Sequence, residues 1–181
     1  RGLLALAGDG AEVAAVMAHE IGHITAHHAA ARAELERRGR LFSRVSTQLL
    51  ARPDQGEEYA ARTKLTVARF SREQEFEADK IGVGISARAH FDPYGASRFL
   101  TAMERNAELK ADKSANDPRA QDFLSLHPAT PERIQSAQAT ARQYSSPQSD
   151  ERDRETYLAA IDNLVYGEDP SEGFVRGHRF L

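Results

Sequence analysis

The chain has 181 residues, a formal net charge of −3 and a sequence pI of about 6.2, which gives no electrostatic reason to expect a nucleic-acid partner. It contains no cysteine, which excludes disulfides and thiolate zinc sites. No apolar run approaches the roughly 18 residues that a membrane-spanning helix needs, so this segment is not expected to cross a bilayer. The length suits one compact domain, or one domain with an appendage.

The first predicted element is a long helix. Asp9 is expected to be its N-cap, with Glu12 three residues on as in a capping box. The helix is expected to run through an Ala-rich and then charged segment to Arg38, with Gly39 as the C′ residue. Apolar side chains recur at helical spacing and predict a buried face, made of Val13, Val16, Met17, Ile21 and Ile24.

The rest of the chain also reads as mainly helical. Turn residues, N-cap and Pro pairs such as Asp92-Pro93 and Thr130-Pro131, and apolar spacing define the boundaries. The expected elements are helices 41–51, 57–87 (one long helix or two), 93–109, 131–144 and 150–166, the last ended by Gly167; a turn at 53–56; a loop at 111–125; a linker at 145–149; and a strand within 173–181. The sequence therefore predicts a mostly α-helical fold without an internal repeat.

Residues 19–23 read His-Glu-Ile-Gly-His and carry the most chemical information. On a helix, positions four apart differ by only about 40° around the axis, so His19 and His23 can reach one Zn²⁺ from a single face. Glu20 is turned about 100° away, where it reaches a metal-bound water as a general base rather than the metal itself. Gly22 costs about 1 kcal/mol relative to Ala in mid-helix, so we expect either a close approach to the metal by another segment or a peptide, or close helix–helix packing.

Two histidines leave a zinc site incomplete, so a third protein ligand is required. The Gly and His that a metzincin would place at positions 26 and 29 are both Ala in this chain. His27 lies about 12 Å along the helix from His19 and cannot share its ion. We interpret His27 and His28 as surface residues or as residues that support a ligand from behind. The third ligand is therefore expected to be a carboxylate from a second helix.

Glu75 and Asp79 offer such carboxylates, four residues apart on one face of the helix predicted over 57–87. One can ligate the metal while the other accepts the free N–H of a ligating imidazole and fixes its tautomer. The alternative is a solvated acidic face, since carboxylates recur at every second residue from Glu73 to Asp79. Because the histidine pair needs a partner, the ligand interpretation is the stronger one.

Three ordered motifs resemble the HtpX and CAAX prenyl protease family of gluzincin peptidases. They are residues 16–23, residues 70–79, and residues 126–134 with a His-Pro followed by Arg-Ile. The chain is most similar to the soluble, cell-envelope branch of bacterial members. That resemblance implies a zincin-like helical metalloprotease domain with a second ligand-bearing helix. It implies His19, His23 and Glu75 as ligands of one Zn²⁺, Glu20 as the base, and Asp79 behind a ligating histidine. The segment between the first two motifs, often strongly apolar in such proteins, is polar here.

These observations predict a zinc-dependent metalloendopeptidase in which Glu20 activates a zinc-bound water. Residues 1–145 would form the catalytic domain, and residues 146–181 a linker, a helix and the start of a C-terminal segment. Because the chain begins with Arg1, we expect that it is processed or truncated. The alternative function is a chaperone-like or adaptor module whose zinc site is structural or latent.

His127 and Arg133 are the remaining candidates for catalysis. His127 follows a polar segment, so it could fill the fourth position of the metal and keep the enzyme latent. Swung aside, His127 together with Arg133 could stabilise the developing oxyanion. A third interpretation is that His127-Pro128 only breaks the chain before the next helix, with the imidazole bonded to a nearby carbonyl.

The resemblance implies a location and a partner. We expect a bacterial periplasm or cell envelope, where the substrate would be a misfolded or envelope polypeptide. Residues 41–51 could make peripheral contact with a membrane or an unfolded client, although core packing is the more common use of such a helix. The sequence does not determine the oligomeric state.

Overall fold

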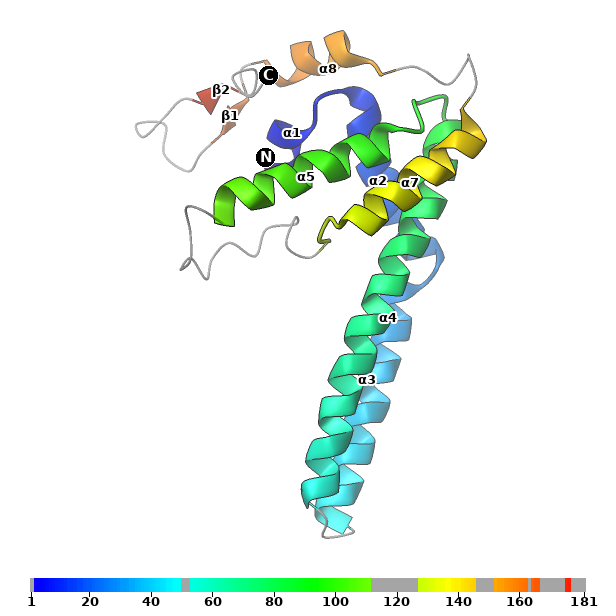
Figure 1. Ribbon diagram of the computed structural model, residues 1–181, viewed down its shortest axis with the longest axis vertical. Helices are drawn as coiled ribbons and strands as arrows, with labels where there is room; N and C mark the ends of the chain where they lie inside the picture. The colour runs from blue at the N-terminus through cyan, green and yellow to red at the C-terminus, as the bar shows by residue number, and fades with distance from the viewer. Residues whose placement is uncertain are drawn as a thin grey trace. The chain divides into compact units, whose positions relative to one another are not determined.

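The computed structural model describes residues 2–49, 53–111, 127–145, 152–162, 164–166 and 175–176. Over these residues the fold is mostly α-helical, as the sequence predicts, and no helix among them is long and apolar enough to span a membrane. The elements in chain order (Figure 1) are α1 (Gly2–Leu6), α2 (Gly10–Thr25), α3 (His28–Arg44), a π-helical turn η1 (Val45–Leu49), α4 (Pro53–Arg88), α5 (Gly95–Ala111), α7 (Pro131–Tyr144), α8 (Arg154–Ile161), β1 (Val165–Tyr166) and β2 (Val175–Arg176).

Backbone contacts divide the chain into two compact units. The first unit comprises Arg1–Glu20 and Asp79–Leu181, and the second unit comprises Ile21–Ala78. Both α2 and α4 continue without a break through the points of division. Residues on either helix therefore keep the spacing that helical geometry gives them along that helix.

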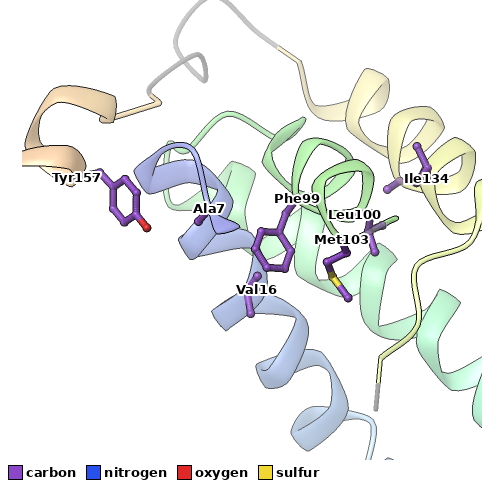
Figure 2. Packing of buried hydrophobic residues seen from close by; sticks show 8 residues of the cluster. Ala7, Val16, Phe99, Leu100, Met103, Ile134 and Tyr157 are labelled. Carbon is purple, nitrogen blue, oxygen red and sulfur yellow. The ribbon is translucent and has the colours of Figure 1, made fainter. Parts of the chain in front are cut away.

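The first unit contains the main apolar core, where helices from both ends of the sequence meet. Figure 2 shows Val16 of α2, Phe99 of α5, Ile134 of α7 and Tyr157 of α8 as members of one buried cluster. A network of ion pairs holds the start of α2 to α5, because the Arg98 guanidinium pairs with the carboxylates of Asp9, Glu12 and Asp92. The apolar cluster and these ion pairs together fix the segment of α2 that leads to His19.

The second unit is a helical hairpin in which α3 runs beside the first part of α4 (Figure 1). Ser43 Oγ donates a hydrogen bond to the Gly56 carbonyl oxygen at 3.0 Å. Gly39, expected to end a helix, lies inside α3, where a Cβ would collide with the Thr63 side chain. Its missing side chain therefore serves helix packing, and the expectation of a C′ glycine is wrong.

The first predicted helix is in fact two helices. α2 ends at Thr25, and α3 begins at His28 after a short turn. The cause is His27, whose backbone is left-handed with φ 55° and ψ 33°. A residue in that conformation cannot continue a right-handed helix.

The expected buried face of α2 is also wrong for three of its five residues. Val16 is buried, but Met17, Ile21 and Ile24 are 63%, 42% and 71% exposed. The side of α2 that packs closely carries small residues instead, namely Ala11, Ala15, Ala18 and Gly22. Small side chains allow neighbouring backbones to approach, so contact forms there and not along the row of large side chains.

Other boundaries differ more modestly. Helix 57–87 is confirmed, but it begins at Pro53, so the expected turn at 53–56 is its first turn, with Pro at a position that needs no N–H donor. Residues 41–44 end α3 and 45–49 form the π-helical turn. Helix 131–144 is confirmed, with Thr130 as its N-cap. The helix expected from Asp92-Pro93 begins at Gly95.

The C-terminal prediction is wrong in part. Among the described residues of the helix expected over 150–166, only those of α8 are helical, and Val165 and Tyr166 form strand β1 instead. This strand pairs antiparallel with β2, where Val165 lies opposite Arg176 and Tyr166 opposite Val175. The strand expected within 173–181 is therefore present at 175–176. The predicted loop 111–125, apart from Ala111, and linker residues 146–149 lie outside the described residues.

Candidate metal centre

Helix α2 carries His19, Glu20 and His23, and its start is well defined. Asp9 Oδ1 accepts a hydrogen bond from the Glu12 backbone N–H at 2.8 Å, as expected of an N-cap. The Glu12 carboxylate turns back and accepts from the Gly8 N–H at 2.8 Å. The uninterrupted helix then offers both imidazoles from one face.

Two glycines allow α2 and α4 to approach backbone to backbone. In the first unit, a Cβ on Gly82 would lie 2.9 Å from His19 N, and in the second unit a Cβ on Gly22 would lie 2.9 Å from the Ala78 carbonyl oxygen. Both distances are shorter than real Cβ contacts. Of the two interpretations of Gly22, close helix–helix packing is therefore the one that the structure supports.

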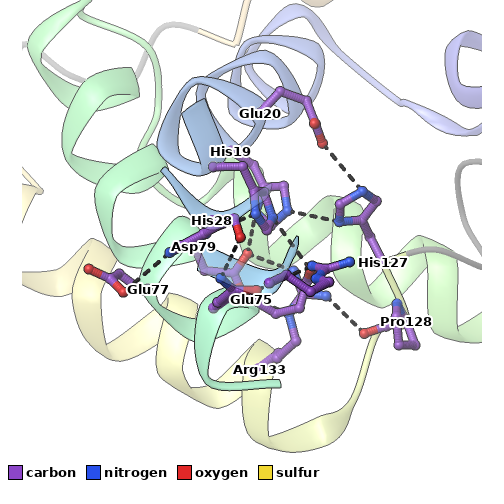
Figure 3. A network of polar contacts seen from close by, with 12 residues as sticks. His19, Glu20, His28, Glu75, Glu77, Asp79, His127, Pro128 and Arg133 are labelled. Carbon is purple, nitrogen blue, oxygen red and sulfur yellow. Dashed lines mark hydrogen bonds and ion pairs between the residues drawn. The ribbon is translucent and has the colours of Figure 1, made fainter. Parts of the chain in front are cut away.

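In the first unit, His19 is held from behind by a buried ion pair (Figure 3). Its Nδ1 lies 2.9 Å from Asp79 Oδ1. Arg133 donates two hydrogen bonds to Asp79, both 2.7 Å long, and a third of 2.8 Å to the Pro128 carbonyl oxygen. If the His19 proton is on Nδ1, where Asp79 accepts it, Nε2 carries the lone pair that a metal would need.

The charge on Asp79 is secured by its neighbours. Burial by itself raises the pKa of this carboxyl group, but the hydrogen bonds from Arg133 and His19 more than offset that effect. The net result is a pKa below the ordinary value. Asp79 therefore remains a carboxylate, which can accept the His19 proton but cannot donate one back.

In the second unit, His23 faces the other carboxylate of α4. Its Nε2 lies 3.3 Å from Glu75 Oε1, and Glu75 is buried. The opposite nitrogen, Nδ1, lies 2.9 Å from Nδ1 of His28, whose Nε2 lies 3.3 Å from Glu77 Oε2. The sequence left both His27 and His28 as surface or supporting residues and placed Glu77 in a charge run; of the two histidines, His28 is buried and His27 is exposed.

His127 lies against His19 and Glu20 in the first unit. Its Nδ1 is 3.3 Å from His19 Nε2, and the two rings meet edge to face. Its Nε2 is 3.7 Å from Glu20 Oε1, which is an ion-pair distance and too long for a hydrogen bond. Among the described residues, this buried Glu20 oxygen has no hydrogen-bond partner. A carboxylate oxygen in that position can accept a hydrogen bond.

The side-chain atoms that each unit offers are of the types that bind zinc. Each unit presents an imidazole whose Nδ1 is engaged from behind, which is the usual arrangement of metal-ligating histidines. The second unit adds a buried carboxylate oxygen from Glu75. Imidazole nitrogen and carboxylate oxygen are the ligands of catalytic zinc sites that lack cysteine.

Comparison with known proteins agrees with this chemistry. The sequence pattern of peptidase family M48 matches residues 1–141. The beta-barrel assembly-enhancing protease of Escherichia coli (strain K12) is 29% identical over 162 residues, which cover 84% of this chain and 32% of that protein. The beta-barrel assembly-enhancing protease of Yersinia pestis is 31% identical over 143 residues, which cover 73% and 28%. The chain thus spans about a third of the length of these relatives, and no solved structure matches it significantly.

Proposed function

This chain belongs to peptidase family M48, and on that premise we propose that it is a zinc-dependent metalloendopeptidase of the gluzincin type, close to the HtpX and CAAX prenyl proteases. One observation carries the proposal: each histidine of the His-Glu-x-x-His motif faces a buried carboxylate of α4, His19 facing Asp79 and His23 facing Glu75. A solvated acidic face would leave Glu75 and Asp79 exposed, whereas both are buried.

We propose His19, His23 and Glu75 as the ligands of one Zn²⁺. Their residue types, with His127 as a fourth candidate, suit a metal ion. The support lies in the continuity of α2 and α4, since each helix keeps its paired residues four positions apart. When bound, zinc would polarise the scissile carbonyl and make a water more acidic.

The roles of the protein groups follow from their contacts. Glu20 would take a proton from the attacking water on Oε1 and pass it to the leaving amine. Asp79 would hold His19 in the ligating tautomer. Arg133 was expected to act on the oxyanion, but its guanidinium is buried against Asp79 and Pro128. We therefore assign Arg133 the role of holding Asp79, because a group so engaged cannot also turn toward a substrate.

Location, domain limits and partners remain part of the proposal. Residues 1–145 would form the catalytic domain and 146–181 the start of a C-terminal segment. The substrate would be a misfolded or envelope polypeptide in a bacterial periplasm or cell envelope, which the names of the relatives support. Exposed Leu41, Phe42 and Val45 support the suggested peripheral contact of residues 41–51 with a membrane or client.

A second candidate function rests on His127. Its Nδ1 lies 3.3 Å from His19 Nε2, the nitrogen that a zinc ion would need. A histidine in this position could complete the metal's ligands and keep the site latent, as in a chaperone-like or adaptor module. Chelator-sensitive cleavage of an unfolded protein separates the two functions, because the module would retain zinc without any turnover.

The test of the peptidase uses isosteric variants. Glu20→Gln should bind one zinc per chain and lose cleavage of an unfolded protein such as casein, because the base is gone while the ligands remain. Glu75→Gln should lose both zinc and cleavage. Glu73→Gln is the matched control, since Glu73 lies on the same helix with an exposed side chain, and it should retain both. Full cleavage by Glu20→Gln would overturn the assignment of the base.

A further inference from the structure

The turn between α2 and α3 contains an unusual backbone conformation. His27 has φ 55° and ψ 33°, a left-handed region that L residues other than Gly, Asn and Asp rarely adopt. No side chain caps the start of α3 at this residue. Strained backbone of this kind persists only where surrounding contacts enforce it. The contacts of the next residue, His28, supply that enforcement.

His28 is held at three points inside the second unit. Its side chain is buried, and its backbone oxygen accepts a hydrogen bond of 3.0 Å from Nε2 of the buried Gln74. Its Nε2 lies 3.3 Å from Glu77 Oε2, and its Nδ1 lies 2.9 Å from Nδ1 of His23. The rings of His23 and His28 meet edge to face with their centroids 4.9 Å apart. The turn at His27 thus brings a second imidazole behind His23.

The Glu77 carboxylate determines which nitrogen of His28 can accept a hydrogen bond. A carboxylate only accepts, so the His28 nitrogen that faces Glu77 must carry a proton. With one proton per ring, Nδ1 of His28 is then an acceptor for Nδ1 of His23. His23 Nε2 also lies 3.3 Å from the Glu75 carboxylate, so either tautomer of His23 has an acceptor. A metal bound at Nε2 would require the one proton of this ring on Nδ1, which is the tautomer that His28 can hold.

We propose that His28 and Glu77 are positioning residues that hold His23 in its metal-ligating tautomer and orientation. They do for His23 what Asp79 and Arg133 do for His19. Each of the two histidines of the motif would then have its own supporting pair behind Nδ1. This inference rests on the proposed zinc site.

The test compares three substitutions at neighbouring histidines in the full chain. His28→Phe keeps a ring of similar size but has no acceptor, and it should weaken zinc binding roughly 10–100-fold. His28→Asn places an amide oxygen where Nδ1 was. Its zinc affinity should be within about threefold of that of the unmodified protein, a much smaller loss than removal of the supporting group causes. His27→Asn is the matched control, because His27 is exposed and Asn tolerates the left-handed region. It should bind zinc as the unmodified protein does.

Zinc affinity is measured by competition with a chelator of known affinity, and helix content by circular dichroism. A nuclear magnetic resonance signal from the hydrogen-bonded Nδ1 proton of His23 should be present in the zinc-loaded protein and absent in His28→Phe. Glu77→Ala tests the same support without risk to the fold, since the Glu77 side chain is 62% exposed. Glu77→Ala should weaken zinc binding several-fold, which is less than the roughly 10–100-fold loss expected when a ligand's direct partner is removed. Glu73→Ala should leave zinc affinity unchanged.

Unchanged zinc affinity in both Glu77→Ala and a folded His28→Phe would overturn the positioning role. A loss of affinity that His28→Asn does not restore would also overturn it, because it would show that the ring and not the acceptor is required. A parent protein that binds no zinc at all would instead contradict the proposed function on which the inference rests.

Discussion

Gly82 should be one of the least replaceable residues near the candidate site. A Cβ at this position would lie 2.9 Å from His19 N, 3.1 Å from the Ala18 carbonyl carbon and 3.1 Å from His19 Cα. All three atoms belong to the backbone of α2, so they cannot rotate away as a flexible side chain could. Gly82→Ala must therefore push α2 and α4 apart where His19 meets Asp79.

The size of the effect follows from two opposing terms. Replacing a mid-helix Gly by Ala gains about 1 kcal/mol from helix propensity. Overpacking costs about 1–3 kcal/mol, and the rigid backbone contacts favour the upper end of that range. The net loss should be about 1–2 kcal/mol, which corresponds to a fall in Tm of roughly 2–8 °C for a chain of this length. Zinc affinity should fall as well, because the hydrogen bond between His19 and Asp79 is displaced.

Gly84→Ala provides the matched control two residues along the same helix. There the nearest atoms are Tyr144 Oη at 3.2 Å and Cζ at 3.4 Å, which lie at the end of a side chain that is 40% exposed and not in a backbone. The propensity gain should then dominate, with a change between zero and about 1 kcal/mol in favour of folding. Thermal unfolding followed by circular dichroism measures both variants. Equal stability of Gly82→Ala and Gly84→Ala would refute the account of the α2–α4 contact.

Two further predictions concern the groups behind and beside His19. Asp79→Asn should lower zinc affinity roughly 10–100-fold and should destabilise the fold by about 3–5 kcal/mol, because the buried Arg133 loses its charged partner. Since the pKa of Asp79 is lowered in the folded state, its stabilising contribution should be complete above its ordinary value of 3.8 and should be lost as the pH falls below it through the folded value. As the pH is lowered, the Tm of the parent protein should therefore fall more steeply than the Tm of Asp79→Asn. Equal slopes in the two proteins would contradict this. His127→Ala should increase cleavage if His127 blocks the site, or lower kcat roughly 10²–10³-fold if it stabilises the oxyanion. Unchanged cleavage and zinc affinity would exclude both roles.

The pairing of the motif histidines with carboxylates of α4 could be predicted because it depends on local geometry. The spacing of His19 and His23, and of Glu75 and Asp79, needs only that each segment be helical. Residue spacing determines which side chains share a helix face wherever that helix lies. The same is true of α7, where Thr130 accepts a hydrogen bond from the Arg133 N–H, as the Thr-Pro pair predicts.

Features that depend on tertiary packing could not be predicted in this way. Nothing in the residue type of His27 predicts a left-handed backbone, because the conformation arises from the contacts of His28. Apolar periodicity assigned Met17 and Ile24 to a buried face, although α2 packs through alanines and a glycine instead. The link from His23 to Glu77 passes through His28, which lies beyond the left-handed turn at His27, and sequence spacing does not show it.

The proposed function requires that residues of helices α2 and α4 bind one zinc ion. A crystal structure of the zinc-loaded protein, with the metal located by its anomalous scattering, tests this most directly. Nε2 of His19 and of His23 should lie about 2.0–2.1 Å from the ion and a Glu75 oxygen about 2.0–2.2 Å from it, with Asp79 and His28 behind the two rings. Zinc bound at another place, or bound without His23 or Glu75, would contradict it.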